Sequence, residues 1–268
     1  MNNQSLSLFN RRYKAIRKEK SYYNKFIFNG HFTVFLLILL GAFIFGYGEW
    51  LQHIPQHIDY ALFASIAVAL VSLFPIRTLL KDADKIFLLP FEKHMKDYMQ
   101  VSLIYSYSSR IFLQVILLII LFPLFYRLND NHFAFYIVFA ISAIIFPYLG
   151  LLVKWQWLKL NLSSWTINLL LFVLFGITFY LILRFHNYFA IIFIFIVGVL
   201  LLILKLNSKK QLFPWERMIA IEQQKHTNYY KFVNMFTDVK HLRESAVRRS
   251  YLDFILPTPK GNKFNENR

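Results

Sequence analysis

Six long apolar stretches constrain the fold of this chain more than any other feature of its sequence. Each contains about 18–22 residues, and a helix of that length, at ~1.5 Å per residue, spans the ~30 Å hydrocarbon core of a bilayer. Because lipid offers no hydrogen-bond partners, the backbone N–H and C=O groups of each stretch must be paired within a helix. The sequence therefore predicts an all-α integral membrane protein with about six transmembrane helices, at residues 31–51, 58–76, 109–126, 132–153, 165–184 and 188–206.

The basic residues between these stretches lie almost entirely on one side of the predicted membrane. Most of the 30 Lys and Arg residues lie before the first stretch, between the second and third, or after the sixth, and Lys154 and Lys159 lie between the fourth and fifth. Basic residues are retained in the cytoplasm, so both termini are predicted to be cytoplasmic. This divides the chain into a basic N-terminal segment (1–30), a six-helix membrane domain (31–206) with a cytoplasmic loop at 77–108, and a basic tail (207–268).

Composition agrees with a membrane protein and excludes several other classes. Apolar residues make up 57% of the chain, which exceeds the usual share in a soluble domain. The net charge of +16 belongs to residues that flank the apolar stretches, so anionic lipid headgroups, not nucleic acid, are the expected electrostatic partner. The chain contains no Cys, which excludes disulfides, thiolate nucleophiles and Cys-ligated metals.

The segment before the first stretch has the pattern of an amphipathic helix. Phe9, Tyr13, Ile16, Tyr23 and Ile27 recur at helical spacing, with Arg and Lys residues mostly between them. Such a helix can lie in the cytoplasmic headgroup layer before the chain enters the membrane. The alternative is a solvated basic tail.

The loop after the second stretch has the most informative local pattern. One helical face carries apolar residues up to Phe87, and Pro90 ends that helix. A short helix that ends in apolar residues beside a membrane can dock into a groove on a soluble partner. The alternative is an interfacial helix that lies against lipid. The residues on the predicted face are Ile76, Leu79, Leu80, Ala83, Ile86 and Phe87.

The C-terminal tail is polar and basic but retains a helical pattern. Its apolar residues keep roughly one face, which predicts a helix over 214–236 with Pro214 in its first turn. A second short helix is predicted from Asp238 to about Tyr251, followed by a disordered end beyond Pro257.

The familiar motifs of catalysis and nucleotide binding are absent. No Gly is followed by Lys, which excludes a Walker A loop, and neither a His-Glu-x-x-His motif nor a Gly-x-Ser-x-Gly elbow occurs. His53 and His57 are separated by Pro55, which breaks the helix that would align them on a metal. Arg110 and Lys154 lie near the ends of their stretches, where snorkelling explains them. We therefore expect no catalytic residues, no metal site and no cofactor in this chain.

Three groups of residues together resemble the EcsB family of bacterial ABC-transporter membrane subunits. The first runs from Pro75 to Pro90, the second begins with Phe213-Pro214-Trp215-Glu216 and continues through Asn234, Phe236 and Asp238, and the third is Arg248-Arg249-Ser250-Tyr251-Leu252-Asp253. They lie at widely spaced points in the expected order, and the resemblance covers nearly all of the chain. Members of this family are usually longer, with further membrane spans after the third group.

The resemblance implies a permease subunit in the bacterial cell membrane that works with a separate EcsA-like ATPase. That ATPase would bind ATP and Mg²⁺, and the family is linked to peptide export and protein secretion. A homodimer of permease subunits is a further expectation. Within the loop, Asp82 and Asp84 would make polar contacts with the ATPase, and Leu88, Leu89 and Phe91 would insert into it. The implied ATPase-coupling residues are Lys81, Asp82, Ala83, Asp84, Phe87, Leu88, Leu89, Pro90 and Phe91, and the implied cytoplasmic motif is Phe213, Pro214, Trp215, Glu216, Asn234, Phe236 and Asp238.

Two other functions are weighed against a permease. An integral membrane enzyme or peptide-processing factor needs a polar constellation in or beside the spans, and it would act without an ATPase. A membrane scaffold that recruits soluble proteins through its basic tail would still bind them after deletion of the spans.

Overall fold

The computed structural model describes residues 3–55, 57–88, 90, 92, 95–128, 133–185, 189–208 and 211–237. Over these residues the chain forms helices and no strand, which confirms the all-α fold. Five of the helices, α2, α5, α6, α7 and α8, are long and apolar enough to cross a membrane. The helices are α1 (Asn3–Ile27), α2 (Gly30–Trp50), α3 (Tyr60–Ser72), α4 (Asp84–Phe87), α5 (Met95–Leu128), α6 (Phe133–Lys159), α7 (Ser164–Arg184), α8 (Phe189–Asn207) and α9 (Trp215–Val233).

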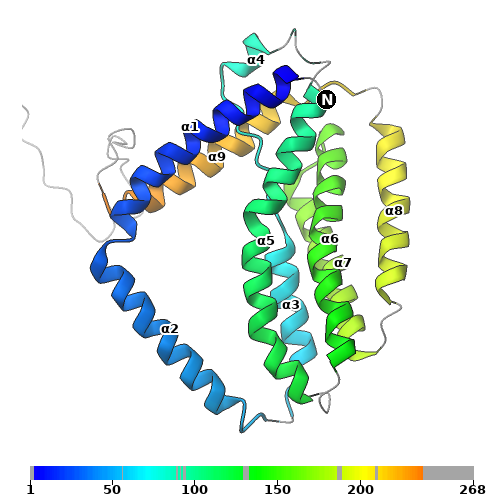
Figure 1. Ribbon diagram of the computed structural model, residues 1–268. Helices are drawn as coiled ribbons and strands as arrows, with labels where there is room; N and C mark the ends of the chain where they lie inside the picture. Colours follow the sequence, from blue (N-terminus) through cyan, green and yellow to red (C-terminus); the bar gives the residue numbers. More distant parts are fainter. Residues whose placement is uncertain are drawn as a thin grey trace, which may run out of the picture.

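Helices α3, α5, α6, α7 and α8 pack side by side as an upright bundle (Figure 1). Its centre is aromatic: Phe146 of α6 stacks on Phe193 of α8 with ring centroids 4.0 Å apart, and both rings are buried. Phe175 of α7 lies against Gly150, where a Cβ would come within 2.8 Å of the ring. Lipid tails are as apolar as these side chains, so the bundle is held by close van der Waals packing.

The second predicted span is wrong in its extent. Helix α3 has only 13 residues and ends at Ser72, so at ~1.5 Å per residue it is ~20 Å long and does not cross a bilayer alone. Pro75 explains the early end, because proline lacks a backbone N–H and disfavours helical geometry at the preceding residue. Residues 73–80 continue without helical structure.

Helix α5 differs from its prediction in the opposite direction. The apolar pattern predicts a span from residue 109, but the helix begins at Met95 and runs for 34 residues. Its first turns therefore extend beyond the apolar part of the bundle, on the side where α1 and α9 lie (Figure 1).

Helix α2 stands apart from the bundle (Figure 1). None of its residues is buried. It is attached at its C-terminal end, where the Tyr47 hydroxyl donates to the Ile120 carbonyl at 2.6 Å and Trp50 meets Tyr60 edge to face. An apolar helix without buried residues is consistent with a surface that lipid covers.

Helices α1 and α9 lie side by side across one end of the bundle, and α4 lies beyond them (Figure 1). The apolar face of α1 is buried against protein: Phe9 contacts Tyr98 and Tyr105 of α5 edge to face. The prediction of a helix before the first span is thus confirmed, and α9 confirms the helix predicted over 214–236 to within a few residues. The helix predicted after Asp238 and the end beyond Pro257 lie outside the described residues.

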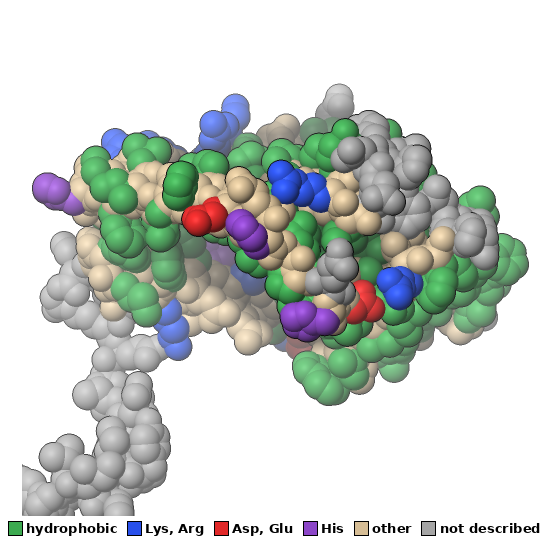
Figure 2. All heavy atoms as spheres, turned by 90° about the horizontal axis from the view of Figure 1, so that it is seen from below, with side chains coloured by type: hydrophobic (Ala, Val, Ile, Leu, Met, Phe, Trp, Pro, Cys, Tyr) green, Lys and Arg blue, Asp and Glu red, His purple; other side chains and the backbone are tan. Residues whose placement is uncertain are grey.

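The opposite end of the molecule has a different surface. Figure 2 shows hydrophobic side chains over most of it, with isolated Lys, Arg, Asp, Glu and His side chains. The ion pairs Arg12–Asp84 and Lys85–Glu216 lie at the other end, formed by α1, α4 and α9, which is the end that the distribution of basic residues predicts to be cytoplasmic.

Candidate functional site

The centre of the charged end is the extended segment 73–80. Phe74, Ile76, Thr78, Leu79 and Leu80 are all buried there. A non-helical segment at this depth has backbone N–H and C=O groups that no helix pairs, and such groups are tolerated only where protein satisfies them. We call this segment, with α1, α4, the first turns of α5 and α9, the polar layer.

Two lysines donate to carbonyls of the segment from different helices. Lys154 of α6 is only 6% exposed, and its Nζ donates to the Phe74 carbonyl at 2.9 Å. Lys225 of α9 donates to the Ile76 carbonyl. The interpretation of Lys154 as a snorkelling residue is therefore wrong, because its ammonium group is directed at the protein backbone instead of the aqueous interface.

Helix α5 supplies hydroxyl groups to the next residues. Ser102 donates to the Arg77 carbonyl at 2.6 Å, and Ser106 accepts from the Arg77 N–H at 2.7 Å. The Tyr98 hydroxyl donates to the Thr78 carbonyl at 2.7 Å. These side chains lie on one face of α5 at helical spacing, which explains why polar residues stand in its first turns.

Glu222 of α9 is the acidic residue of this network. It is buried and accepts from the Thr78 N–H at 2.9 Å, and the Lys225 ammonium lies 3.7 Å from the same carboxylate oxygen. A buried carboxylate needs hydrogen-bond donors and a nearby cation, and Glu222 has both.

An ion pair joins α1 to α4. Arg12 and Asp84 are 2.5 Å apart, with side chains 11% and 7% exposed, and Arg12 also donates to the Leu79 carbonyl at 3.3 Å. Burial lowers the pKa of Arg12, but the hydrogen bonds and charges of Asp84 and Tyr98 together outweigh burial and leave that pKa raised. Leu79 has φ 56°, a left-handed conformation that is unfavourable for leucine, so these contacts hold a strained backbone.

Helix α4 projects from this fixed base. Ile86 and Phe87 are 75% and 76% exposed, although both are large and apolar. Asp84, at the first turn, also accepts from the Lys81 N–H at 2.7 Å, so its carboxylate faces the protein interior. Of the other coupling residues, Lys81, Asp82, Ala83 and Pro90 are exposed and Leu88 is half-buried, whereas Leu89 and Phe91 lie outside the described residues.

The helical face predicted from Ile76 to Phe87 is wrong for its first half. Only Asp84–Phe87 is helical, while residues 73–80 are extended and still bury Ile76, Leu79 and Leu80. The spacing of apolar residues fits both backbones over so short a stretch, and Pro75 favours the extended one.

The Phe-Pro-Trp-Glu motif connects the bundle to α9. The Phe213 N–H donates to Glu92 at 2.8 Å, and its ring meets those of Trp155 and Trp215. Pro214 precedes the first turn of α9, and Glu216 pairs with Lys85 of α4. Asn234 and Phe236 follow the end of α9 and are exposed, and Asp238 lies outside the described residues.

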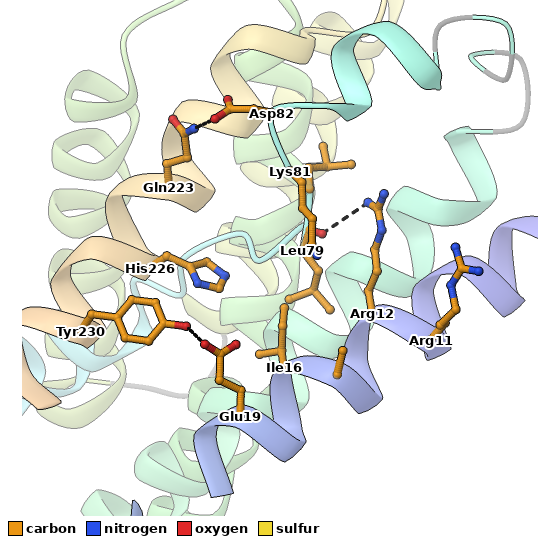
Figure 3. A pocket seen from close by; sticks show the side chains of 12 residues that line it. Arg11, Arg12, Ile16, Glu19, Leu79, Lys81, Asp82, Gln223, His226 and Tyr230 are labelled. Atoms are coloured by element: carbon orange, nitrogen blue, oxygen red, sulfur yellow. Dashed lines mark hydrogen bonds between the residues drawn. The ribbon is translucent and has the colours of Figure 1, made fainter. Parts of the chain in front are cut away.

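A pocket of about 610 Å³ lies between α1, α9 and residues 79–82. In Figure 3, Arg11, Arg12 and Glu19 face it from α1, and His226 and Tyr230 face it from α9. Hydrogen bonds from Tyr230 to Glu19 and from Gln223 to Asp82 connect α9 to the elements around it. These contacts join α9 to α1 and to the loop that carries α4.

The residues that hold segment 73–80 were missed by reading the sequence. Arg12, Tyr98, Lys154, Glu222 and Lys225 are separated from their partners in this segment by 20 to 149 positions. Pro75 inside a predicted span was the available signal, since it leaves backbone groups that other side chains must satisfy. Among the described residues, no three His, Cys, Asp or Glu side chains are grouped so that they hold a metal ion.

Comparison with known proteins identifies the family. Residues 6–268 match the family described as "Bacterial ABC transporter protein EcsB". The chain is 30% identical over 259 residues to "Protein EcsB" of Bacillus subtilis (strain 168), an alignment that covers 95% of this chain and 63% of that protein. No solved structure matches the chain. The match extends from α1 through the bundle and the polar layer, and it agrees with the resemblance found in the three motif groups. The chain is therefore a multi-pass membrane protein that belongs to the EcsB family of bacterial ABC transporter proteins.

Proposed function

We propose that this chain is the membrane permease subunit of an ABC transporter and that α4 is the element to which a separate ATPase subunit docks. The observation that carries the proposal is the exposure of Ile86 and Phe87 on a short helix with a fixed base. Two large apolar side chains in water are unfavourable unless a partner covers them.

The attachment of α4 supports a role in transmitting force. Its first turn is tied to α1 through Arg12 and Asp84, and its flank is tied to α9 through Lys85 and Glu216. The segment before it is hydrogen-bonded to α5, α6 and α9. A displacement of α4 by a partner would therefore be passed to α5 and α6 of the bundle and to α1 and α9 at its end, which is what a coupling element requires.

The remaining parts of the proposal follow from the family. ATP and Mg²⁺ would be bound by the EcsA-like ATPase, and the hydrolytic step would belong to that subunit. Both termini and the polar layer would be cytoplasmic, where an ATPase reaches them. The transported substrate would be a peptide, in export or in support of protein secretion. Because the chain spans 63% of the length of the Bacillus subtilis relative, these statements concern the whole transporter and are proposals.

The test is co-purification of the tagged chain with a co-expressed EcsA-like ATPase. Ile86→Asp/Phe87→Asp should reduce the recovered ATPase at least tenfold and remove stimulated ATP turnover, while membrane insertion is unchanged. Leu88→Asp/Leu89→Asp should have the same effect if those residues insert into the partner.

Leu212→Asp is the matched control. Leu212 is 78% exposed and lies between α8 and α9. Its substitution replaces an exposed apolar side chain by a carboxylate, as in the α4 variant, but at a position away from α4. If Leu212→Asp reduces ATPase recovery as much as the α4 variant does, or if the α4 variant retains full turnover, docking at α4 is wrong.

A further inference from the structure

A second pocket, smaller than the one in Figure 3, lies between α1, α5, α9 and residues 75–79 and has a volume of about 310 Å³. Four cationic side chains line it from four elements, and a single carboxylate, Glu222, lines it with them. Tyr105, His226, Asn228 and Tyr229 are the other polar residues of its wall. The four cations are Lys20 of α1, Arg77 of the extended segment, Arg110 of α5 and Lys225 of α9.

The positive charge of this pocket is not neutralised by the protein. Glu222 is engaged by Lys225 and by the Thr78 N–H. Within the described part of the chain, no carboxylate lies at ion-pair distance from Lys20, Arg77 or Arg110. The Nε of Arg110 is buried without any hydrogen-bond partner there. A buried donor without an acceptor is unfavourable, so an acceptor from outside the chain would stabilise this side chain.

The cations also repel one another. The pKa of Lys20 is lowered by burial and then by Arg77, with Glu222 and Glu19 opposing. Burial lowers the pKa of Lys225 to about 8, with Arg77 and Arg110 contributing and Glu222 opposing. Each shift means that the charged form is less favourable there than in water, and a bound anion would stabilise the charged form.

The position of the pocket points to the membrane surface as the source of the anion. Arg110 lies where the apolar part of α5 begins, and Phe112 and Leu113, two and three residues further on, are 71% and 49% exposed. A hollow of about 480 Å³ adjoins the pocket and shares Ile16, Lys20 and Tyr105 with it. Arg17, Ser108 and Ser109 line that hollow. A headgroup bound among these residues leaves its acyl chains beside the exposed apolar surface of α5.

We propose that this pocket binds a phosphate group, supplied by the headgroup of an anionic phospholipid. Lys20, Arg77 and Arg110 would contact the phosphate oxygens, because guanidinium and ammonium groups form short charge-assisted hydrogen bonds with phosphate. Basic pockets at the cytoplasmic ends of membrane helices bind such headgroups. This inference concerns a lipid ligand and is independent of ATPase docking at α4.

The test uses the purified full chain, delipidated in detergent and offered phosphatidylglycerol and phosphatidylcholine in equal amounts. Native mass spectrometry should show phosphatidylglycerol retained at least fivefold over phosphatidylcholine. Lys20→Gln/Arg110→Gln should remove that preference. The control, Lys14→Gln/Lys18→Gln, removes two charges from the exposed face of the same helix and should keep it. Loss of the preference in both variants, or no preference in the unmodified chain, would overturn the proposal.

A second measurement distinguishes the source of the phosphate and guards against misfolding. Phosphatidylglycerol should raise the melting temperature of the unmodified chain, and inorganic phosphate or glycerol phosphate at the same concentration should not. If the soluble phosphates raise it equally, the pocket binds free phosphate instead of a lipid. In phosphatidylcholine alone, Lys20→Gln/Arg110→Gln should melt at or above the temperature of the unmodified chain, because repulsion is relieved. A lower melting temperature there would mean that these cations stabilise the fold without a ligand, against the proposal.

Discussion

The bundle and the polar layer are built by different interactions. In the bundle, α6, α7 and α8 meet through rings and small residues, as where Phe146 stacks on Phe193 and Phe175 lies against Gly150. In the polar layer, residues 73–80 are not helical. Charged or hydroxyl side chains from α1, α5, α6 and α9 form hydrogen bonds with the backbone of these residues. The stability of the bundle depends on how well its side chains fit together, whereas that of the polar layer depends on the direction of hydrogen bonds and on charge.

This difference determines what each region tolerates. Packed apolar cores accept many substitutions of similar volume, whereas a buried polar network is strongly destabilised when one partner is lost. The same network has charges that respond to pH and to bound ions, which an apolar bundle lacks. Substitutions in the two regions should therefore differ in how much they lower the free energy of unfolding, in whether that loss depends on pH, and in which second substitution restores stability.

The largest effect is expected from breaking the buried ion pair of the polar layer. Arg12→Met leaves Asp84, whose side chain is 7% exposed, without its cation. Removing one partner of a buried pair lowers the free energy of unfolding by about 3–5 kcal/mol. Denaturant titration in mild detergent, with circular dichroism as the signal of unfolding, would measure this loss. The double variant Arg12→Met/Asp84→Leu should recover most of the loss, and a single-variant change below about 1 kcal/mol would contradict a buried pair.

The next effect is a dependence on pH that comes from Lys225 of the polar layer. Lys225 has a pKa of about 8 in the folded chain and an ordinary value of 10.5 when unfolded. Between these values the unfolded chain binds more protons at Lys225, so the contribution of Lys225 to stability rises as pH increases from about 8 to 10.5. The gain relative to Lys225→Met is at most about 3 kcal/mol over that window.

Matched titrations test this pH dependence. Unfolding of the unmodified chain, Lys225→Met and the bundle variant Leu171→Ala would be compared from pH 7 to about pH 10.5. Leu171→Ala should shift the curve of stability against pH without changing its slope, because Leu171 is fully buried in the bundle and carries no proton. Equal slopes for Lys225→Met and the unmodified chain would contradict a lowered pKa for Lys225.

Adding side-chain volume in the bundle should lower the free energy of unfolding by less than loss of the buried ion pair does. Gly150→Val places methyl groups where even a Cβ would lie 2.8 Å from the Phe175 ring, and that ring is held in the aromatic core. Overpacking of this kind lowers the free energy of unfolding by about 1–3 kcal/mol. Gly198→Val is the control, since a Cβ at Gly198 meets nothing within 4 Å. A control as unstable as Gly150→Val would mean that the branched side chain, not the clash, is responsible.

The smallest effect is expected at the exposed ion pair between α4 and α9. The side chains of Lys85 and Glu216 are 55% and 78% exposed, so water and salt screen their attraction. Lys85→Gln should leave the melting temperature nearly unchanged, in contrast to Arg12→Met. A large loss would show that α4 is held by its flank instead of by Asp84.

The sequence patterns predicted the bundle better than the polar layer. Long apolar runs predicted α2, α6, α7 and α8 because lipid enforces helical structure on any such run. The pattern also predicted α9, whose apolar face buries Met218 and Ile219. It failed at residues 73–80, because the apolar spacing there suits an extended chain as well as a helix.

The network around that segment had no local pattern to predict it. Arg12 and Asp84 are 72 positions apart, and Lys154 and Phe74 are 80 apart. An isolated charged residue near the end of a span looks the same in the sequence whether it reaches water or a backbone carbonyl. Only the three-dimensional arrangement distinguishes these two environments, and it assigns Lys154 to the second.

The length of α5 has a mechanical consequence. At ~1.5 Å per residue, its 34 residues form one rod of ~51 Å that is hydrogen-bonded to segment 73–80 near one end and packed in the bundle along the rest. A rod pivoting about one end by about 10° would move its other end by about 9 Å. Segment 73–80 and the bundle are thus joined by one helix with a single internal proline, Pro123, near its far end, so a tilt at segment 73–80 would be passed along most of the bundle.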